Sequence, residues 1–343
     1  MPTKMNRSEQ QPYVPKGDDN GGEYRSYGFG GQAVPKGAYK KIKPKGIKVE
    51  PSEETKSSFD KYLEEKHKGS EFGKRLKEDF EQGQKEGKTL LDKAMQQKGI
   101  SYSQSKNGQD YFSPLEDVVL SNRGAKSKSY TKGGTFYHES YHALDYAYGG
   151  VSSTYVTSNG KTLKEMLIGR QKPPIKERLE KAREEETAYR QEWLKTHFED
   201  YEDLQNKREE IRKERDEIYS KTEDKTNRWS ISRKHREKEY DEILDKIFEI
   251  ESSYYQERHK VWGDVSDMFC MQGYGYVFGM GHSSSYAKDT SRRCREFFAE
   301  CGSAENTNPQ SLELIKKYFP EQYQAYRECI EHIKEKQKNE PNN

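Results

Sequence analysis

Hydrophobic residues recur at helical spacing in the segment that follows the first 52 residues. Ser52, followed by two glutamates, has the features of a helix N-cap and predicts a helix that begins there. A second helical stretch is predicted to run to Gly99. Its apolar positions are Leu76, Phe80, Leu90, Leu91 and Met95. We expect these two helices to cover one face of a hydrophobic core.

The pattern changes to a period of two in residues 99–121. Aromatic and β-branched residues alternate with polar ones on both sides of Asn107-Gly108, a dipeptide typical of tight hairpin turns. Residues 117–121 predict a further strand. After a loop rich in Gly, Ser and Lys, the stretch GGTFYHESYHALDYAYGG, residues 133–150, predicts a helix.

Between Pro174 and Gly263 charged residues dominate, and the apolar ones again recur at helical spacing. The first run is Ile175, Leu179, Ala182, Tyr189, Trp193, Leu204, Ile211 and Ile218, and the second is Ile243, Leu244, Ile247, Phe248 and Ile250. A polar break at 221–227 separates the runs, which predicts an antiparallel helical hairpin with arms on the order of 50 to 70 Å long. A coiled coil with another chain fits the same pattern.

These patterns predict an α+β fold with a core in two parts. Gly, Pro, Lys and Tyr are frequent at the N-terminus, where turn dipeptides recur, so little of that segment can order itself. Asn308-Pro309 predicts the start of a helix near the C-terminus. The expected organisation is a flexible arm (1–52), the first part of the core (53–170), a helical hairpin insertion (171–262), the second part of the core (263–335) and a disordered tail (336–343).

Composition narrows the classes of protein that this chain can belong to. Only 30% of the residues are hydrophobic and 35% are charged, which supports a moderate core with long solvated appendages. Lys and Arg number 61 against 59 Asp and Glu, so charge gives no signal for nucleic acid or an anionic membrane as a partner. The four cysteines have neither metal-site nor disulfide-framework spacing.

No run of apolar residues is long enough for a membrane span, and no secretion signal is visible at the N-terminus. We therefore expect a cytoplasmic or virion-associated protein.

The chemistry of the sequence is concentrated in His138-Glu139-Ser140-Tyr141-His142, which fits the pattern HExxH. Histidines four apart lie on one face of a helix and can bind one Zn²⁺, while Glu139 sits beside a bound water and can take its proton. A chance match somewhere in such a chain has odds of roughly one in fifty. The competing interpretation is an ordinary amphipathic helix.

A third ligand would favour the metal site. If the helix continues, Asp145 stands about 10 Å along the axis from His138, too far for ligand bonds near 2 Å, so we expect it to orient a histidine or to close a neighbouring loop. The better candidate is Glu296, one turn before Glu300 in CREFFAECGSA. In this interpretation Glu296 binds zinc and Glu300 accepts a hydrogen bond from a ligand histidine.

Three segments, TFYHESYHALD, GHSSSYAKDTSRRCREFFAE and IKKYFP, resemble the zincin-type metallopeptidase domains of anthrax lethal factor and of phage and mobile-element proteins, including minor head proteins. The likeness covers about residues 108–150 and 264–335. It implies zinc bound by His138, His142 and Glu296, with Glu139 as the general base.

The same resemblance implies an oxyanion-stabilising tyrosine before the third ligand. Tyr286 is its counterpart, although it lies ten residues before Glu296, farther than in lethal factor, and His282 is a rival for the role. The family also uses the strand before the HExxH helix as a sheet edge that binds an extended peptide. Val118, Val119 and Leu120 would form that edge.

The leading hypothesis is a zinc-dependent endopeptidase that cleaves a peptide or protein substrate. The alternative is a structural, minor head or adaptor protein of a phage particle that keeps the zincin scaffold with little or no protease activity, because the arm and the helical hairpin suit protein partners. A toxin that cleaves a host protein is a third hypothesis, and the likeness to lethal factor is its only support.

Overall fold

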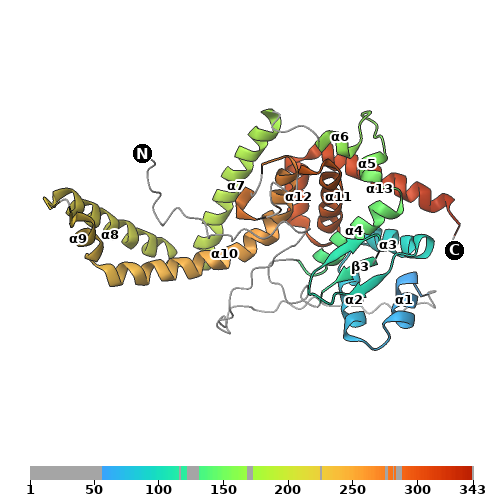
Figure 1. Ribbon diagram of the computed structural model, residues 1–343, viewed down its shortest axis with the longest axis horizontal. Coiled ribbons are helices and arrows are strands. Elements are labelled where there is room, and N and C mark those ends of the chain that lie inside the picture. The colour runs from blue at the N-terminus through green and yellow to red at the C-terminus, as the bar shows by residue number, and fades with distance from the viewer. Residues whose placement is uncertain are drawn as a thin grey trace.

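The computed structural model describes residues 56–115, 117–121, 131–167, 173–224, 226–274, 277–280, 282 and 288–341 (Figure 1). In this part of the chain helices predominate and the strands form one small mixed sheet, so the α+β prediction is confirmed. The predicted N-terminal arm, residues 1–52, lies outside the described residues. Among the described helices, none combines the length and the apolar character that a membrane crossing requires.

Three helices precede the sheet in the part of the chain that begins at residue 56. They are α1 (Ser58–Lys66), α2 (Glu71–Glu81) and α3 (Lys85–Lys98). The predicted cap Ser52 lies outside the described residues, and α1 begins after Ser57, whose hydroxyl accepts a hydrogen bond from the backbone N–H of Asp60 at 3.1 Å.

The prediction of one helical stretch up to Gly99 was wrong, because the chain turns between α2 and α3. At Gly83 a Cβ atom would lie 1.8 Å from the hydroxyl oxygen of Tyr137, so only glycine fits. That hydroxyl donates a hydrogen bond to the backbone carbonyl of Phe80 at 2.7 Å, which satisfies a carbonyl at the end of α2. The break thus docks these two helices onto the helix that carries the histidines.

The sheet has the strand order β1-β3-β2. Its strands are β1 (Tyr102–Gln104), β2 (Tyr111–Ser113) and β3 (Asp117–Leu120). β3 is parallel to β1 and antiparallel to β2, so the predicted hairpin at Asn107-Gly108 was wrong. The polar loop is held by Ser105, whose hydroxyl accepts bonds from the N–H groups of Gly108 and Gln109, and the wide loop leaves room for β3 between the other two strands.

The central position of β3 also corrects the prediction for Val118, Val119 and Leu120. All three residues are buried, and the strand pairs on both sides, so its backbone is not open to a substrate. Among the described strands the edges are β1 and β2.

We call the part of the fold around the sheet the body. Its remaining helices pack around two central helices, α4, which contacts the sheet, and α11, which pairs with α4 (Figure 1). Together these helices are α4 (Gly134–Ala147), α5 (Val151–Thr154), α6 (Leu163–Leu167), α11 (Thr290–Thr307), α12 (Pro309–Tyr318) and α13 (Pro320–Asn339). The predicted tail begins too early, because α13 continues through Asn339. Buried Gln337 explains this, since its amide donates to the backbone carbonyl of Leu90 on α3 at 3.0 Å.

Within residues 173–224 and 226–274, four helices connect the two parts of the body. They are α7 (Pro173–His197), α8 (Tyr201–Lys221), α9 (Arg228–Lys234) and α10 (Glu237–Met271). We call α8, α9 and the first half of α10 the arm, which projects from the body (Figure 1). It has a hydrophobic cluster of its own, with contributions from the end of α7 and the middle of α10. The cluster consists of Leu194, Leu204, Ile211, Ile243, Ile247, Ile250 and Tyr254.

α10 joins the arm to the body without a break. It passes the predicted boundary at residue 262 as a continuous helix, and Trp262 and Val265 belong to the core of the body. On the other side, α7 adds Ile175 and Leu179 to the same core. The arm is therefore fixed to the body through two helices.

Candidate metal centre

Two helices bring the predicted ligands together. His138 and His142 lie one turn apart on α4, and Glu296 lies on α11. The two Nε2 atoms are 3.1 Å apart, and Oε2 of Glu296 is 3.4 Å from Nε2 of His138 and 3.5 Å from Nε2 of His142. His138 and Glu296 are buried and His142 is half-buried. These three residues form a cluster that can hold a metal ion.

The spacing of the three donor atoms fits a tetrahedral site. Ligand atoms about 2.0 to 2.1 Å from a zinc ion lie about 3.3 to 3.4 Å from one another when the angles are tetrahedral. The observed separations are 3.1, 3.4 and 3.5 Å. Two imidazole nitrogens and one carboxylate oxygen are also a donor set that zinc accepts, with a fourth position left for water or substrate.

The pairing of α4 and α11 sets this geometry. Ser303 donates a hydrogen bond to the backbone carbonyl of Gly134 at 3.0 Å, and the Asn306 amide donates to the hydroxyl of Tyr141 at 3.1 Å. The N-terminus of α11 is capped by Asp289, which accepts a bond from the N–H of Ser291 at 2.9 Å. Both helices are thus anchored independently of any ligand.

Charges within the cluster favour a cation. Burial alone lowers the pKa of His138, but the carboxylates of Glu300 and Glu296 outweigh it and raise that pKa well above its ordinary value. Burial alone raises the pKa of Glu296, and the neighbouring His142, His138 and His282 lower it well below its ordinary value. A positive charge between these side chains is therefore electrostatically stabilised.

Glu139 follows His138 on α4 and is buried with it. Burial raises the pKa of the Glu139 carboxyl. The two histidines lower this pKa, whereas the negative charges of Glu296 and Asp110 raise it further. A carboxyl group with a raised pKa is suited to accept and return a proton near neutral pH.

The two predicted supporting acids have different surroundings. Oε2 of Glu300 is 3.6 Å from Nδ1 of His138, on the side of the ring that faces away from Glu296. Asp145 accepts hydrogen bonds from the backbone N–H and the hydroxyl of Ser152, at 2.8 and 2.9 Å. Glu300 is therefore placed to hold a ligand histidine, whereas Asp145 closes the loop between α4 and α5.

Of the two predicted oxyanion donors, Tyr286 lies outside the described residues. Nδ1 of His282 is 2.9 Å from Oδ1 of Asp267 on α10. Burial alone lowers the pKa of His282, but Asp267, Glu296 and Glu300 together raise it to about 9. His282 therefore carries a positive charge at neutral pH and lies within the electrostatic reach of the cluster.

Sequence reasoning missed two acids of α10. Asp267 contacts His282 and positions its ring. Asp264 lies beside Glu300, and its burial together with the charge of Glu300 raises the pKa of Asp264 well above its ordinary value. A protonated Asp264 can share its proton with Glu300. The signal was available in VWGDVSDMFCM, residues 261–271, because two acids in an otherwise apolar helical run need partners.

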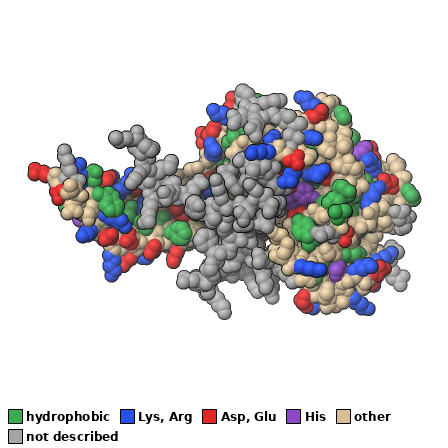
Figure 2. All heavy atoms as spheres, in the orientation of Figure 1, with side chains coloured by type: hydrophobic (Ala, Val, Ile, Leu, Met, Phe, Trp, Pro, Cys, Tyr) green, Lys and Arg blue, Asp and Glu red, His purple; other side chains and the backbone are tan. Residues whose placement is uncertain are grey.

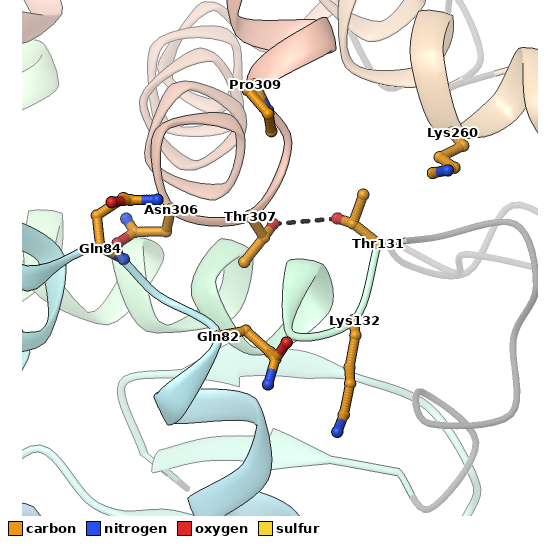
Figure 3. Close-up of a pocket in the computed structure, with 8 residues that line it drawn as sticks. All are labelled: Gln82, Gln84, Thr131, Lys132, Lys260, Asn306, Thr307 and Pro309. Atoms are coloured by element: carbon orange, nitrogen blue, oxygen red, sulfur yellow. Dashed lines mark hydrogen bonds between the residues drawn. The ribbon is translucent and has the colours of Figure 1, made fainter. Parts of the chain in front are cut away.

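A hollow of about 470 Å³ lies elsewhere, near the N-terminal ends of α4 and α12 (Figure 3). Its lining includes two lysines, Lys132 and Lys260, and the hydroxyls of Thr131 and Thr307, which are 3.0 Å apart. None of the predicted site residues lines it, so it is separate from the candidate metal centre.

Comparisons with protein-family models, with curated proteins and with solved structures found no match to this chain. The interpretation of the site therefore rests on the residues and the geometry described above.

Proposed function

We propose that this chain is a zinc-dependent endopeptidase with a zincin-type active site. The observation that carries the proposal is the triangle of donor atoms from His138, His142 and Glu296, with Glu139 next to the first ligand. Zinc is the metal that this donor set and this spacing favour.

A bound zinc ion would supply Lewis acidity, lowering the pKa of a water molecule and polarising the substrate carbonyl. Glu139 accepts a proton from the attacking water and passes it to the amine nitrogen as the C–O bond forms and the C–N bond breaks. His282 donates from Nε2 to the developing oxyanion, because its Nδ1 is held by Asp267. Glu300 fixes the orientation of His138.

The substrate strand is assigned to β2, since β3 is central. β2 is half-buried, forms an edge among the described strands and packs on α4, with the ring centroids of Phe112 and Tyr146 5.7 Å apart. A peptide added to this edge would run beside the helix that carries the ligands.

The second candidate is a structural or adaptor protein, such as an assembly protein of a phage particle, with a vestigial site. The projecting arm favours it, because a rigid arm with its own core suits contacts with other proteins. The full set of ligands and the adjacent base favours the enzyme.

A peptide library incubated with the zinc-loaded parent and with Glu139→Gln separates the two. Because the variant retains all three ligands, the peptidase proposal predicts equal metal content and loss of cleavage. Cleavage at the parental rate by the variant would exclude Glu139 as the base, and a zinc-loaded parent that cleaves nothing would favour the structural protein.

A further inference from the structure

The end of the arm exposes apolar side chains among positive charges. Trp229 is 65% exposed and Ile231 is 44% exposed, both on α9. The Arg233 guanidinium lies 5.0 Å from the centre of the Trp229 ring. Residues 219–236, which we call the arm tip, contain six Lys or Arg and two Asp or Glu. Exposed apolar side chains that are grouped at one end of a charged arm are typical of a contact surface.

The adjoining part of α10 has the opposite charge. Residues 237–251, which we call the acidic stretch, contain seven Asp or Glu and two Lys. Within it Phe248 is 59% exposed. Asp241, Asp245 and Glu249 are exposed, succeed one another at helical spacing, and make no ion pair with the part of the chain that the structure describes. The exposed phenylalanine therefore stands among acids that form no ion pair within the described residues.

The two surfaces are complementary in charge and each offers an aromatic side chain, but one arm cannot bring its own two surfaces together. α10 is a continuous helix, and Phe248 lies about 17 Å along its axis from the start at Glu237. Figure 2 shows hydrophobic side chains at the surface of the arm between acidic and basic ones.

We propose that the arm pairs with the arm of a second copy of this chain in antiparallel orientation. The arm tip of each copy lies on the acidic stretch of the other, so that Trp229 packs against Phe248 of the second copy. Two identical contacts then form around one two-fold axis, which closes the assembly as a dimer. In the dimer, Asp241, Asp245 and Glu249 lie beside the arginine and lysine side chains of the second copy's arm tip, and both aromatic side chains are removed from water.

The acidic stretch makes a negatively charged partner for the arm tip unfavourable. A nucleic acid or an anionic membrane would be attracted by Arg233 and Lys234 but repelled by the acids that begin directly after the tip. A second arm satisfies both charge signs at once. This inference does not depend on the proposed peptidase activity.

The test is sedimentation velocity of the full-length protein over a concentration series, with two charge-reversal variants. One carries Arg233→Glu and Lys234→Glu, and the other carries Asp241→Lys and Asp245→Lys. We expect the parent to form a dimer and each variant alone to dissociate at least about tenfold more readily, because the symmetry doubles every repulsive contact. Mixing the two variants should restore the dimer, since both contacts then join opposite charges.

A matched control reverses two exposed lysines far along the chain from the arm, Lys61→Glu on α1 and Lys68→Glu in the turn after it, and should leave the dimer unchanged. Circular dichroism of each variant verifies folding before sedimentation. A parent that stays monomeric at every concentration overturns the proposal. So does a dimer that survives both reversals, or a mixture of the two variants that stays monomeric.

Discussion

Gly302 of α11 lies directly against the ring of Tyr141 of α4, so closely that a Cβ atom at residue 302 would come within 2.0 Å of the tyrosine Cδ1. Tyr141 is fully buried and lies one residue before His142 of the candidate metal centre. The absence of a side chain at this position therefore sets how near the carboxylate of Glu296 comes to the histidines.

This contact makes Gly302→Ala a sharp test of the helix pairing. The added methyl group must push α11 away from α4, so we expect zinc affinity to fall by at least about tenfold and the free energy of unfolding to fall by about 1 to 3 kcal/mol. Zinc titration and thermal unfolding of the metal-free protein measure the two effects.

Gly263→Ala is the matched control, because its Cβ would lie 3.3 Å from the nearest atom, a ring nitrogen of His259, and so asks for a shift of only a few tenths of an ångström. It should leave zinc affinity nearly unchanged. Equal loss in both variants would mean that the spacing of α4 and α11 does not govern the site.

The roles of Glu296 and Asp145 can be separated by substitution. We expect Glu296→Ala to lower zinc affinity far more than Asp145→Ala, because the Glu296 carboxylate faces both histidines whereas Asp145 bonds Ser152. Asp145→Ala leaves a buried N–H without its acceptor and should lower the free energy of unfolding by about 1 to 3 kcal/mol. Isothermal titration with zinc checks the order of affinities, and the reverse order would identify Asp145 as a ligand.

A third prediction concerns pH and the pair formed by His282 and Asp267. The pKa of His282 is raised from 6.5 to about 9 in the fold, so the pair stabilises the protein fully below pH 6.5 and ceases to do so as the pH rises through 9. The charged ring contributes up to about 3 kcal/mol to stability, with Asp267 as the largest source and Glu296 and Glu300 adding to it. In metal-free protein, the loss of stability caused by Asp267→Asn should therefore be largest below pH 6.5 and shrink toward pH 9.

The control for this prediction is the same substitution in a His282→Gln background. With the titrating ring removed, the effect of Asp267→Asn on stability should no longer vary across that pH range. Urea unfolding at a series of pH values gives both comparisons. A pH-independent effect of Asp267→Asn in the parent would contradict the assignment.

The cluster of His138, His142 and Glu296 was predictable because two of its residues have a sequence spacing that is typical of metal sites on helices. HExxH places two histidines on one helical face, and the distant Glu296 stood out through its pairing with Glu300 beside Phe297 and Phe298. Asp264 and Asp267 were overlooked although they lie in the predicted second part of the core. The local pattern gave no sign that α10 continues past the predicted boundary at residue 262 and brings these two acids beside Glu300 and His282.

The errors in the fold have a common cause, which is contact between segments far apart in the chain. Gly83 ends a helix because Tyr137 occupies the space, and Asn107-Gly108 forms a wide loop because β3 inserts between the strands on either side. Local patterns of hydrophobicity contain no information about either contact. They gave the strands correctly but not their order, and so assigned the edge of the sheet to the central strand.

The most direct test of the account is elemental analysis of the purified protein for zinc, carried out on the parent, His142→Ala and Glu139→Gln. We predict about one zinc ion per chain in the parent and in Glu139→Gln, and none in His142→Ala. A folded parent that takes up no zinc even when the ion is supplied would contradict the metal centre and leave α4 as an ordinary amphipathic helix.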